Sequence, residues 1–212
     1  MIVGVDEAGR GPLAGPVCAA AVILGSEHGI VGLADSKALS EKKREQLAPE
    51  IQTKSLAWGI GWASVEEIDA LDILRATFMA MARAVEACLQ KIPVDTAEIN
   101  GAQFKIQVDG NRSPGHFKGP WHWPYDTETI VKGDQKVAEI SAASILAKTA
   151  RDAEMRRLHD LYPVYGFAKH AGYGTAAHLQ ALKEHGVTPI HRRTFSPVAQ
   201  ALAASLGRNH AH

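Results

Sequence analysis

Ile2-Val3-Gly4-Val5-Asp6-Glu7-Ala8-Gly9-Arg10-Gly11, near the start of the chain, is the stretch that decides the fold. Its apolar β-formers predict a buried central strand, and two adjacent carboxylates follow them directly. Asp6 and Glu7 are costly to remove from water at a strand end unless a positive charge compensates them. The pattern therefore indicates a cation site, most simply a metal ion, at the end of the first strand.

The adjacency of the two acids sets a geometric condition. Neighbouring residues of a regular strand point to opposite faces, so both can approach one ion only where the strand ends or bulges. Ala8-Gly9-Arg10-Gly11 supplies such an irregularity. We expect Asp6 to ligate most directly and Glu7 to contribute from the side.

The rest of the chain predicts further strands separated by helices. With 212 residues, 46% of them hydrophobic, and no repeat or linker, we expect one domain over residues 1–212 with a mixed α/β sheet. Apolar runs and alternation predict strands at residues 17–24, 55–63, 104–108 and 129–131. Helical spacing and capping predict helices at residues 41–54, 65–89, 137–161, 175–185 and 198–206, with a loop-like stretch at 162–174.

Charge is unevenly distributed, although the net charge is zero. From residue 163 onward five Lys or Arg residues face one acid, Glu184, which gives this segment a charge of +4 and the preceding residues −4. A metal-centred phosphodiester site beside a phosphate-binding surface would need such a split, although from charge alone we slightly favour an ordinary basic tail. The helical segment from about residue 163 is the candidate for binding a substrate. No stretch suits a signal peptide or a membrane span, so we expect a cytoplasmic protein without membrane contact. A monomer is the simplest expectation. Cys18 and Cys88 fit no metal pattern and are expected to be buried.

Two further acids, Asp109 and Asp134, follow predicted strands. Because functional crevices of α/β sheets lie at strand ends, these acids can converge with Asp6 and Glu7. Four carboxylates without His or Cys suit Mg²⁺ or Mn²⁺, and two such ions about 3.5–4 Å apart promote phosphodiester cleavage. The alternative is that each acid is a separate turn residue, since Asp-Gly and Gly-Asp pairs are common in turns.

Several motifs together match a known family. They are Gly4 to Pro12, Asp35-Ser36-Lys37, Val108 to Asn111, Lys132-Gly133-Asp134, Ser141 to Lys148, and Tyr165-Gly166-Phe167 with His170, Gly172 and Tyr173. Over nearly its full length the chain resembles bacterial type 2 ribonuclease H, or ribonuclease HII. The resemblance implies an RNase H-like fold, with a mixed five-stranded sheet flanked by helices and a C-terminal helical extension. It also implies hydrolysis of the RNA strand of RNA–DNA hybrids, and incision of duplex DNA on the 5′ side of single embedded ribonucleotides.

The resemblance also implies roles for individual residues. Asp6, Glu7, Asp109 and Asp134 look like the carboxylate quartet that binds two Mn²⁺ or Mg²⁺ ions for catalysis, leaving 5′-phosphate and 3′-hydroxyl ends. Gly9, Arg10 and Gly11 resemble the loop whose backbone reads the ribose 2′-hydroxyl, and Tyr173 the ring that packs on the sugar beyond it. The 2′-hydroxyl is the group that distinguishes RNA from DNA at a given position.

Other candidate residues carry weaker signals. Lys169 and Arg192 with Arg193, and also Ser36 and Lys37, are candidates for binding the substrate backbone, with a solvated surface as the alternative. The histidines lack the spacing of a metal site and are interpreted as helix-surface or phosphate-side residues: His170, His178, His185 and His191.

One segment departs from the family pattern. Residues 112–128 are longer than expected between the third and fourth acids and contain Trp121 and Trp123. The indoles could stack on bases, but we favour a surface loop packed on itself. Two other function classes stay open at this stage: a nuclease of the same fold acting on DNA junctions, and a non-catalytic nucleic-acid binder.

Overall fold

The computed structural model describes residues 1–33, 39–92 and 104–209 of the chain. Five strands form one mixed sheet in the order β3-β2-β1-β4-β5, in which β1 pairs antiparallel with β2 and parallel with β4. The strands are β1 (Ile2–Ala8), β2 (Val17–Ile23), β3 (Ala57–Ala63), β4 (Lys105–Asp109) and β5 (Thr127–Ile130). The predicted mixed five-stranded sheet is therefore confirmed, with the acid-tipped first strand at its centre.

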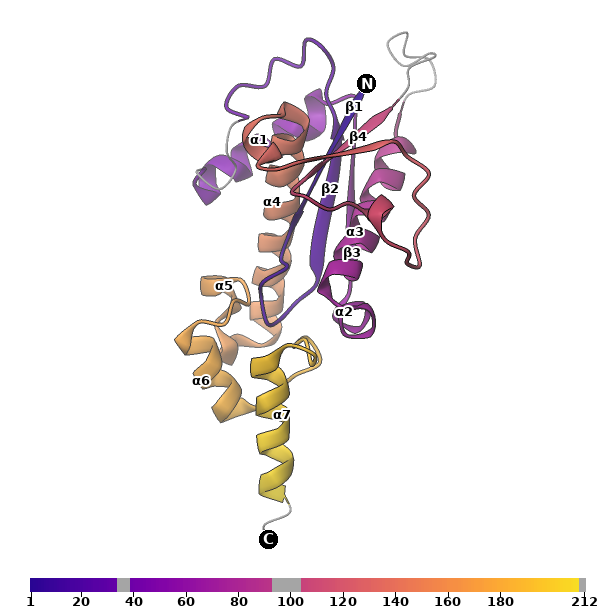
Figure 1. The fold of residues 1–212 in the computed structure, drawn as a ribbon. Coiled ribbons are helices and arrows are strands. Elements are labelled where there is room, and N and C mark those ends of the chain that lie inside the picture. The colour runs from indigo at the N-terminus through magenta and orange to yellow at the C-terminus, as the bar shows by residue number, and fades with distance from the viewer. Residues whose placement is uncertain (34–38, 93–103, 210–212) are drawn as a thin grey trace.

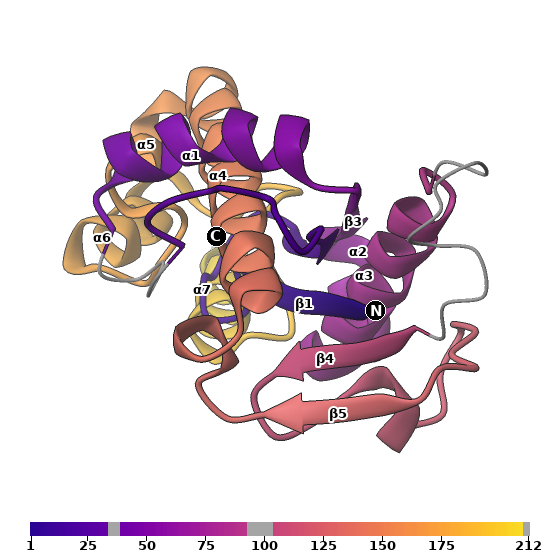
Figure 2. The same ribbon diagram turned by 90° about the horizontal axis from the view of Figure 1, so that it is seen from above.

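Helices cover both faces of the sheet (Figure 2). The α-helices are α1 (Glu41–Lys54), α2 (Val65–Leu71), α3 (Ile73–Leu89), α4 (Ala138–Leu161), α5 (Phe167–His170), α6 (Ala176–His185) and α7 (Ser196–Asn209). Short 3-10 turns lie at η1 (Pro114–His116), η2 (Gly133–Gln135) and η3 (Pro163–Tyr165). The long helix α4 crosses β1 and β2, whereas α3 lies against β2 and β3. None of the helices in these ranges is long and apolar enough to cross a membrane.

Glycines set how closely the two long helices approach the sheet. A Cβ at Gly4 would lie 2.2 Å from the backbone carbon of Glu139, so only glycine lets α4 cross β1 there. On the opposite face, a Cβ at Gly61 would lie 2.1 Å from the carbonyl oxygen of Ala80 in α3. Consequently the fully buried face of β3 is the one with small residues, while Trp58 and Trp62 on its other face are half-buried.

The C-terminal helices form a separate layer at the far end of α4 (Figure 1). Their apolar side chains pack on the β1–β2 connection and on the last turns of α4, in a cluster that includes Leu13, Met155, Phe167, Leu182 and Val198. The predicted C-terminal helical extension is thereby confirmed. It meets the sheet at the connection that follows Asp6 and Glu7.

Some predicted boundaries were wrong. The helix predicted over residues 65–89 is divided at Asp72, which has φ +78°. Asp72 ends α2 with its N–H on Ile68 and caps α3 by accepting from the N–H of Arg75, because a short carboxylate serves well at an N-cap. β5 begins earlier than predicted, α7 is longer, and the stretch predicted as loop contains η3 and α5.

The tryptophans of the long 112–128 segment face the protein. Trp121 packs edge-on against Phe78 at 6.0 Å between ring centroids and donates its indole N–H to the carbonyl of Pro114. Trp123 donates to Thr127 Oγ1 and contacts Tyr125 edge-on. These contacts confirm a loop packed on itself and on α3. The two cysteines are buried and free, as predicted.

Candidate active site

The acids of β1 and β4 come together because the two strands are parallel neighbours. Val5 pairs with Val108, so Asp6 and Asp109 are the next residues on adjacent strands and reach the same edge of the sheet. Asp6 is only 4% exposed and Asp109 is half-buried. Both line a cavity of about 440 Å³, and Glu7 lines it too.

Glu7 reaches this edge from the other face of the sheet. β1 remains regular through Ala8, pairing Glu7 with Ala19 and Ala8 with Cys18, so the expected irregularity begins only after Ala8. Asp6 lies on the α4 side near Ser144, whereas Glu7 lines a second cavity of about 380 Å³ with Phe78 and other residues of α3.

Asp109 connects the two sides because β4 ends there. Asp109 lines both cavities, and Gly110 follows it with φ +97°. β4 therefore ends beside the point where the Asp6 and Glu7 side chains leave opposite faces of β1. Their carboxylates approach Asp109 around that end, without any bulge in β1.

Asp134 is placed beside Asp109 by a tight turn. Lys132 adopts the left-handed region with φ +58° and starts η2, in which Asp134 is 1% exposed. The Asp109 Oδ1 accepts hydrogen bonds from the N–H of Gly133 at 2.7 Å and from the N–H of Asp134 at 3.4 Å. Asp134 is not among the residues that line either cavity. The structure thus brings Asp134 next to the acid cluster through its backbone.

Burial and mutual repulsion act on the carboxylates of the acid cluster. Burial, and then the neighbouring charges of Glu7 and Asp109, raise the pKa of Asp6 well above its usual range, although a hydrogen bond with Ser144 acts in the opposite direction. Burial also raises the pKa of Glu7, while Arg10 lowers it from 3.4 Å away. Within the described ranges, no three His, Cys, Asp or Glu side chains are already grouped closely enough to hold a metal ion, so binding an ion here requires these carboxylates to draw closer together.

The glycine loop lies on the rim of the same cavity. Gly9, Arg10 and Gly11 line it, and Gly9 has φ +99°, a conformation that favours glycine. Tyr173 lines it from the C-terminal layer and is 48% exposed. A Cβ at Gly11 would lie 3.2 Å from Tyr173 Cε1, so the ring sits directly against the loop. Segments distant in the sequence therefore meet beside the acids.

Sequence reasoning missed several residues of this cavity. Ser144, Lys148 and Arg151 of α4 line it, together with Arg44 of α1. Their spacing places the three α4 residues on the helix face that also buries Ile140 and Met155. Polar and charged residues within such an apolar stripe are the signal that could have identified them.

The remaining candidates have different fates. Lys169 is exposed and lines a groove of about 310 Å³ that adjoins the cavity through Lys148 and Tyr173. Ser36 and Lys37 lie outside the described residues. The prediction that Arg192 contacts the substrate backbone was wrong. Arg192 is 0% exposed and donates to four backbone carbonyls, so a phosphate cannot reach it.

The interpretation of the histidines as surface residues was wrong for two of them. His178 and His191 are both 0% exposed, and their Nε2 atoms lie 3.1 Å apart. They are buried because the aromatic rings of Tyr165 and Phe167 pack around them. His185 is exposed and His170 is half-buried.

Comparison with known proteins places this site in a family. A family model described as Ribonuclease HII matches residues 3–198. The chain is 57% identical over 208 residues to Ribonuclease HII of Chromobacterium violaceum, covering 97% of this chain and 96% of that protein. The chain belongs to the ribonuclease HII family. Membership makes it a ribonuclease H, an enzyme that hydrolyses the RNA strand of RNA–DNA hybrids.

Solved structures of related proteins have the same fold. Ribonuclease H2 from Pyrococcus horikoshii OT3 superposes with a TM-score of 0.72 at 26% identity, covering 96% of this chain and 97% of that one. Bst-RNase HIII, whose structure is described as a complex with Mn²⁺, has a TM-score of 0.72 at 17% identity, covering 96% of this chain and 70% of that one. The RNase H-like fold predicted from the family motifs is therefore confirmed.

Proposed function

We propose that the enzyme also incises duplex DNA on the 5′ side of a single embedded ribonucleotide, using two divalent ions held by Asp6, Glu7, Asp109 and Asp134. One observation carries the proposal. Asp6, Glu7 and Asp109, the Gly9–Gly11 loop and Tyr173 line one cavity, which supports a role for the acids in phosphodiester cleavage beside a loop and ring that would read the sugar. In this proposal residues 1–212 form one catalytic domain, which includes the C-terminal helical segment.

The donor set supports Mg²⁺ or Mn²⁺. Asp6, Glu7 and Asp109 offer only carboxylate oxygens, and the burial and mutual repulsion that raise the pKa of Asp6 are what a cation would relieve. Asp134, adjacent to Asp109, would complete the set. Divalent ions bound there would activate water and stabilise charge on the leaving oxygen. The Mn²⁺ complex of Bst-RNase HIII is consistent with this choice.

The chain's own residues would select and orient the substrate. Backbone N–H groups of the glycine loop would donate to the ribose 2′-hydroxyl, and the exposed ring of Tyr173 would pack on the sugar. Hydrolysis then forms the bond from water to phosphorus and breaks the bond to the 3′ oxygen. The ribonucleotide keeps the 5′-phosphate, and the upstream strand keeps a 3′-hydroxyl.

The adjoining groove would receive the backbone of the duplex. Lys148, Lys169 and Arg44 line it, with Tyr173 shared between groove and cavity. Acids are also present, and Lys148 is held by Asp152 at 2.6 Å. The cationic side chains of the groove would position the duplex through contacts with its phosphates, without recognising the base sequence.

The deciding experiment compares cleavage of three duplexes: DNA with one ribonucleotide, all-DNA, and an RNA–DNA hybrid. Each is incubated with Mg²⁺, with Mn²⁺ and with EDTA. We expect a single incision 5′ of the ribonucleotide, no cleavage of all-DNA, and no cleavage of any duplex in EDTA. Equal cleavage of the all-DNA duplex would overturn the proposed selectivity for the ribonucleotide, and cleavage in EDTA would overturn the metal assignment.

Tyr173→Ala tests the sugar-reading role of the ring. We expect about a 10- to 100-fold loss of kcat/KM on the single-ribonucleotide duplex, because a misplaced sugar misplaces the phosphate. The loss should be smaller on a long hybrid, where several registers offer a ribose to the loop. An even loss on both substrates would contradict the role.

A further inference from the structure

Two arginines lie behind the glycine loop and have no place in the chemistry described so far. Arg192 is 0% exposed and Arg151 is 1% exposed, which makes them the largest fully buried side chains of the described residues. A buried guanidinium is costly unless it is fully hydrogen-bonded. Burial and the charge of Arg151 lower the pKa of Arg192 to about 9, so Arg192 still keeps its proton near neutral pH.

The partners of Arg192 are four carbonyls of a single loop. Its Nη2 donates to Gly9 at 2.6 Å, its Nη1 to Arg10 at 2.9 Å and to Pro12 at 2.7 Å, and its Nε to Gly15 at 2.9 Å. The planar guanidinium presents its donors in a fixed geometry. One side chain therefore fixes the direction of four peptide groups.

The carbonyl contacts determine where the loop's N–H groups point. A peptide group is planar and trans, so its N–H points opposite to its C=O, and the described residues contain no cis peptide. The peptide whose carbonyl belongs to Gly9 carries the N–H of Arg10, and that of Arg10 carries the N–H of Gly11. With both carbonyls turned toward buried Arg192, both N–H groups point away from it. Gly9, Arg10 and Gly11 line the cavity on that rim.

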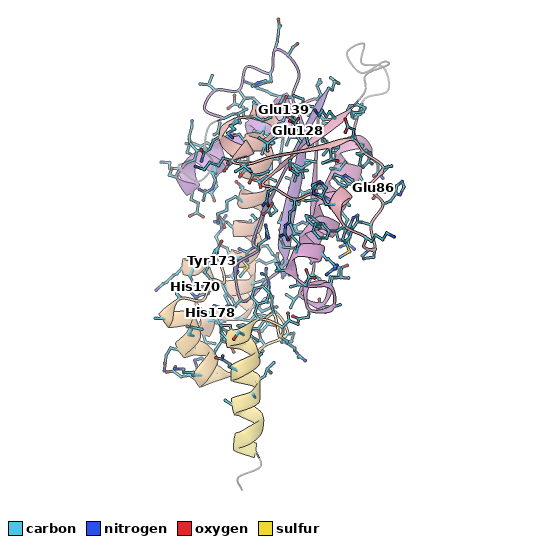
Figure 3. The ribbon with its side chains drawn as sticks, viewed as in Figure 1. Glu86, Glu128, Glu139, His170, Tyr173 and His178 are labelled. Atoms are coloured by element: carbon cyan, nitrogen blue, oxygen red, sulfur yellow. The ribbon has the colours of Figure 1, made fainter. Side chains whose placement is uncertain are left out.

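The neighbouring residue, His191, leads to Tyr173. His191 Nε2 lies 3.1 Å from His178 Nε2, and His178 Nδ1 lies 2.9 Å from the carbonyl oxygen of Tyr173. Because a carbonyl only accepts, neutral His178 carries its hydrogen on Nδ1 and accepts from His191 Nε2–H. His191 Nδ1 then accepts from the N–H of Thr188 at 3.1 Å. Figure 3 shows Tyr173 and His178 together with His170 beside the last turns of α4.

Backbone hydrogen bonds also join residues 190–192 to the connection between β1 and β2. The N–H of Arg192 donates to Leu13 at 2.9 Å, and that of Gly15 donates to Ile190 at 2.8 Å. Ala14 pairs with His191 as an isolated antiparallel bridge. Residues 190–192 therefore pair with the β1–β2 connection on the side of the loop where Arg192 lies.

We propose that His191-Arg192 is a positioning element for ribonucleotide recognition: Arg192 orients the N–H groups of the glycine loop, and His191 orients Tyr173 through His178. The element holds two sugar-reading groups, about 160 residues apart in the sequence, in one register. It touches neither substrate nor metal. This inference rests on the proposed incision at single ribonucleotides.

Arg192→Lys tests the first half of the element. Lysine keeps the charge but cannot reach four carbonyls in a planar fork. We expect kcat/KM on the single-ribonucleotide duplex to fall about 10- to 100-fold, with a smaller loss on a long hybrid, so that the ratio of the two activities changes. In Arg192→Ala, free guanidinium should restore part of the single-ribonucleotide activity, and methylammonium should not.

The control separates positioning from stability. Leu182→Ala removes a 3% exposed side chain from the same C-terminal cluster and should lower the unfolding temperature without changing the ratio of the two activities. If Arg192→Lys lowers the unfolding temperature but keeps the wild-type ratio, the positioning role is overturned, whether or not Arg192→Ala folds. Failure of the wild-type enzyme to prefer the single-ribonucleotide duplex over all-DNA would instead overturn the proposed function.

A double-mutant cycle tests the second half. His191→Phe keeps a buried ring but removes the hydrogen bond to His178. If His191 acts through Tyr173, His191→Phe combined with Tyr173→Ala should lose no more single-ribonucleotide activity than Tyr173→Ala alone, whereas independent effects would multiply. Multiplied losses would overturn the link from His191 to Tyr173.

Discussion

The acid cluster of Asp6, Glu7 and Asp109 lies beside the β1–β2 connection, whose carbonyls Arg151 and Arg192 contact from behind. The buried charges of these two regions are compensated in opposite ways. Asp6, Glu7 and Asp109 are close enough that burial and the neighbouring negative charges raise the pKa of Asp6 and of Glu7. Arg10 and Ser144 compensate for this only in part. Arg151 and Arg192 are more deeply buried but donate to carbonyls of the connection between β1 and β2 and of Ala171.

The difference indicates which charges serve the fold and which serve the reaction. The arginines are satisfied by neutral dipoles of the protein, so they need nothing from outside. The carboxylates are compensated only in part by Arg10, Ser144 and backbone N–H groups, so a bound cation would relieve the repulsion that remains. A buried charge that the protein compensates fully is thus interpreted as a positioning group, and a buried charge that it compensates only in part as a binding group.

Asp109→Asn gives the largest expected effect on the acid side. Asn keeps an oxygen for the N–H groups of Gly133 and Asp134, so the local turn should survive while the negative charge is lost. We expect cleavage of every substrate to fall by at least about 10³-fold, with binding of the duplex largely retained, since the ion and not the phosphate contacts is removed. Cleavage rates and a binding assay in Ca²⁺ measure the two effects.

Glu128→Gln is the matched control for that change. Glu128 is an exposed carboxylate on β5, paired with Lys105 at 3.0 Å and away from Tyr173 (Figure 3). It should cleave at the wild-type rate. Wild-type turnover by Asp109→Asn, or an equal loss in both variants, would refute the assignment of the acids.

The sequence predicted the acid side better than the arginine side. Asp6, Glu7 and Asp109 were found because acids directly after apolar strands are rare unless they serve a purpose, and parallel pairing of β1 with β4 brings them together. What the pattern could not give was how Glu7 reaches the others. That depends on β4 ending at Asp109 while β1 continues to Ala8, which is a property of the assembled sheet.

Arg192 shows why the other side was misread. In a sequence, a basic residue in a positively charged tail suggests a phosphate contact, and nothing local shows that it will be buried. Its burial is decided by the packing of the C-terminal layer on the β1–β2 connection, about 180 residues earlier in the chain. His178 and His191 were misassigned for the same reason, since their partners are also tertiary.

Gly9→Ala should lower the free energy of unfolding by disturbing the packing of the loop against Arg151. Gly9 has φ +99°, and a Cβ there would lie 1.9 Å from Arg151 Nε. Gly186→Ala is the matched control, since Gly186 has φ +78° but no atom within 4 Å of its would-be Cβ. We expect a loss of about 1–3 kcal/mol in both from backbone strain, and a further loss of about 1–3 kcal/mol in Gly9→Ala from the clash.

Thermal or urea unfolding of the two variants measures the difference between them. Gly9→Ala should also lose cleavage of the single-ribonucleotide duplex, because Arg151 and the loop must move apart. Equal destabilisation of the two variants would show that Arg151 does not hold the loop closely, and would weaken the contrast drawn between the two regions.

Asp6→Asn should have the smallest effect on stability and the opposite sign. Because burial and nearby acids raise the pKa of Asp6, the folded state binds more protons than the unfolded state over the pH range between the ordinary carboxyl pKa near 4 and the raised value. The contribution of Asp6 to stability is therefore fully present below that range and is lost as the pH rises through it. Asparagine does not titrate, and it can keep the hydrogen bond with Ser144.

In EDTA the Asp6→Asn variant should consequently unfold a few degrees above wild type at neutral pH, with the two curves converging in acid. Adding Mn²⁺ should stabilise wild type by mass action and the variant much less, which reverses the order. Differential scanning calorimetry across pH, with and without Mn²⁺, measures both. A variant that is less stable than wild type in EDTA at neutral pH would mean that the acid cluster is satisfied internally, as the arginines are, and the distinction between the two regions would no longer hold.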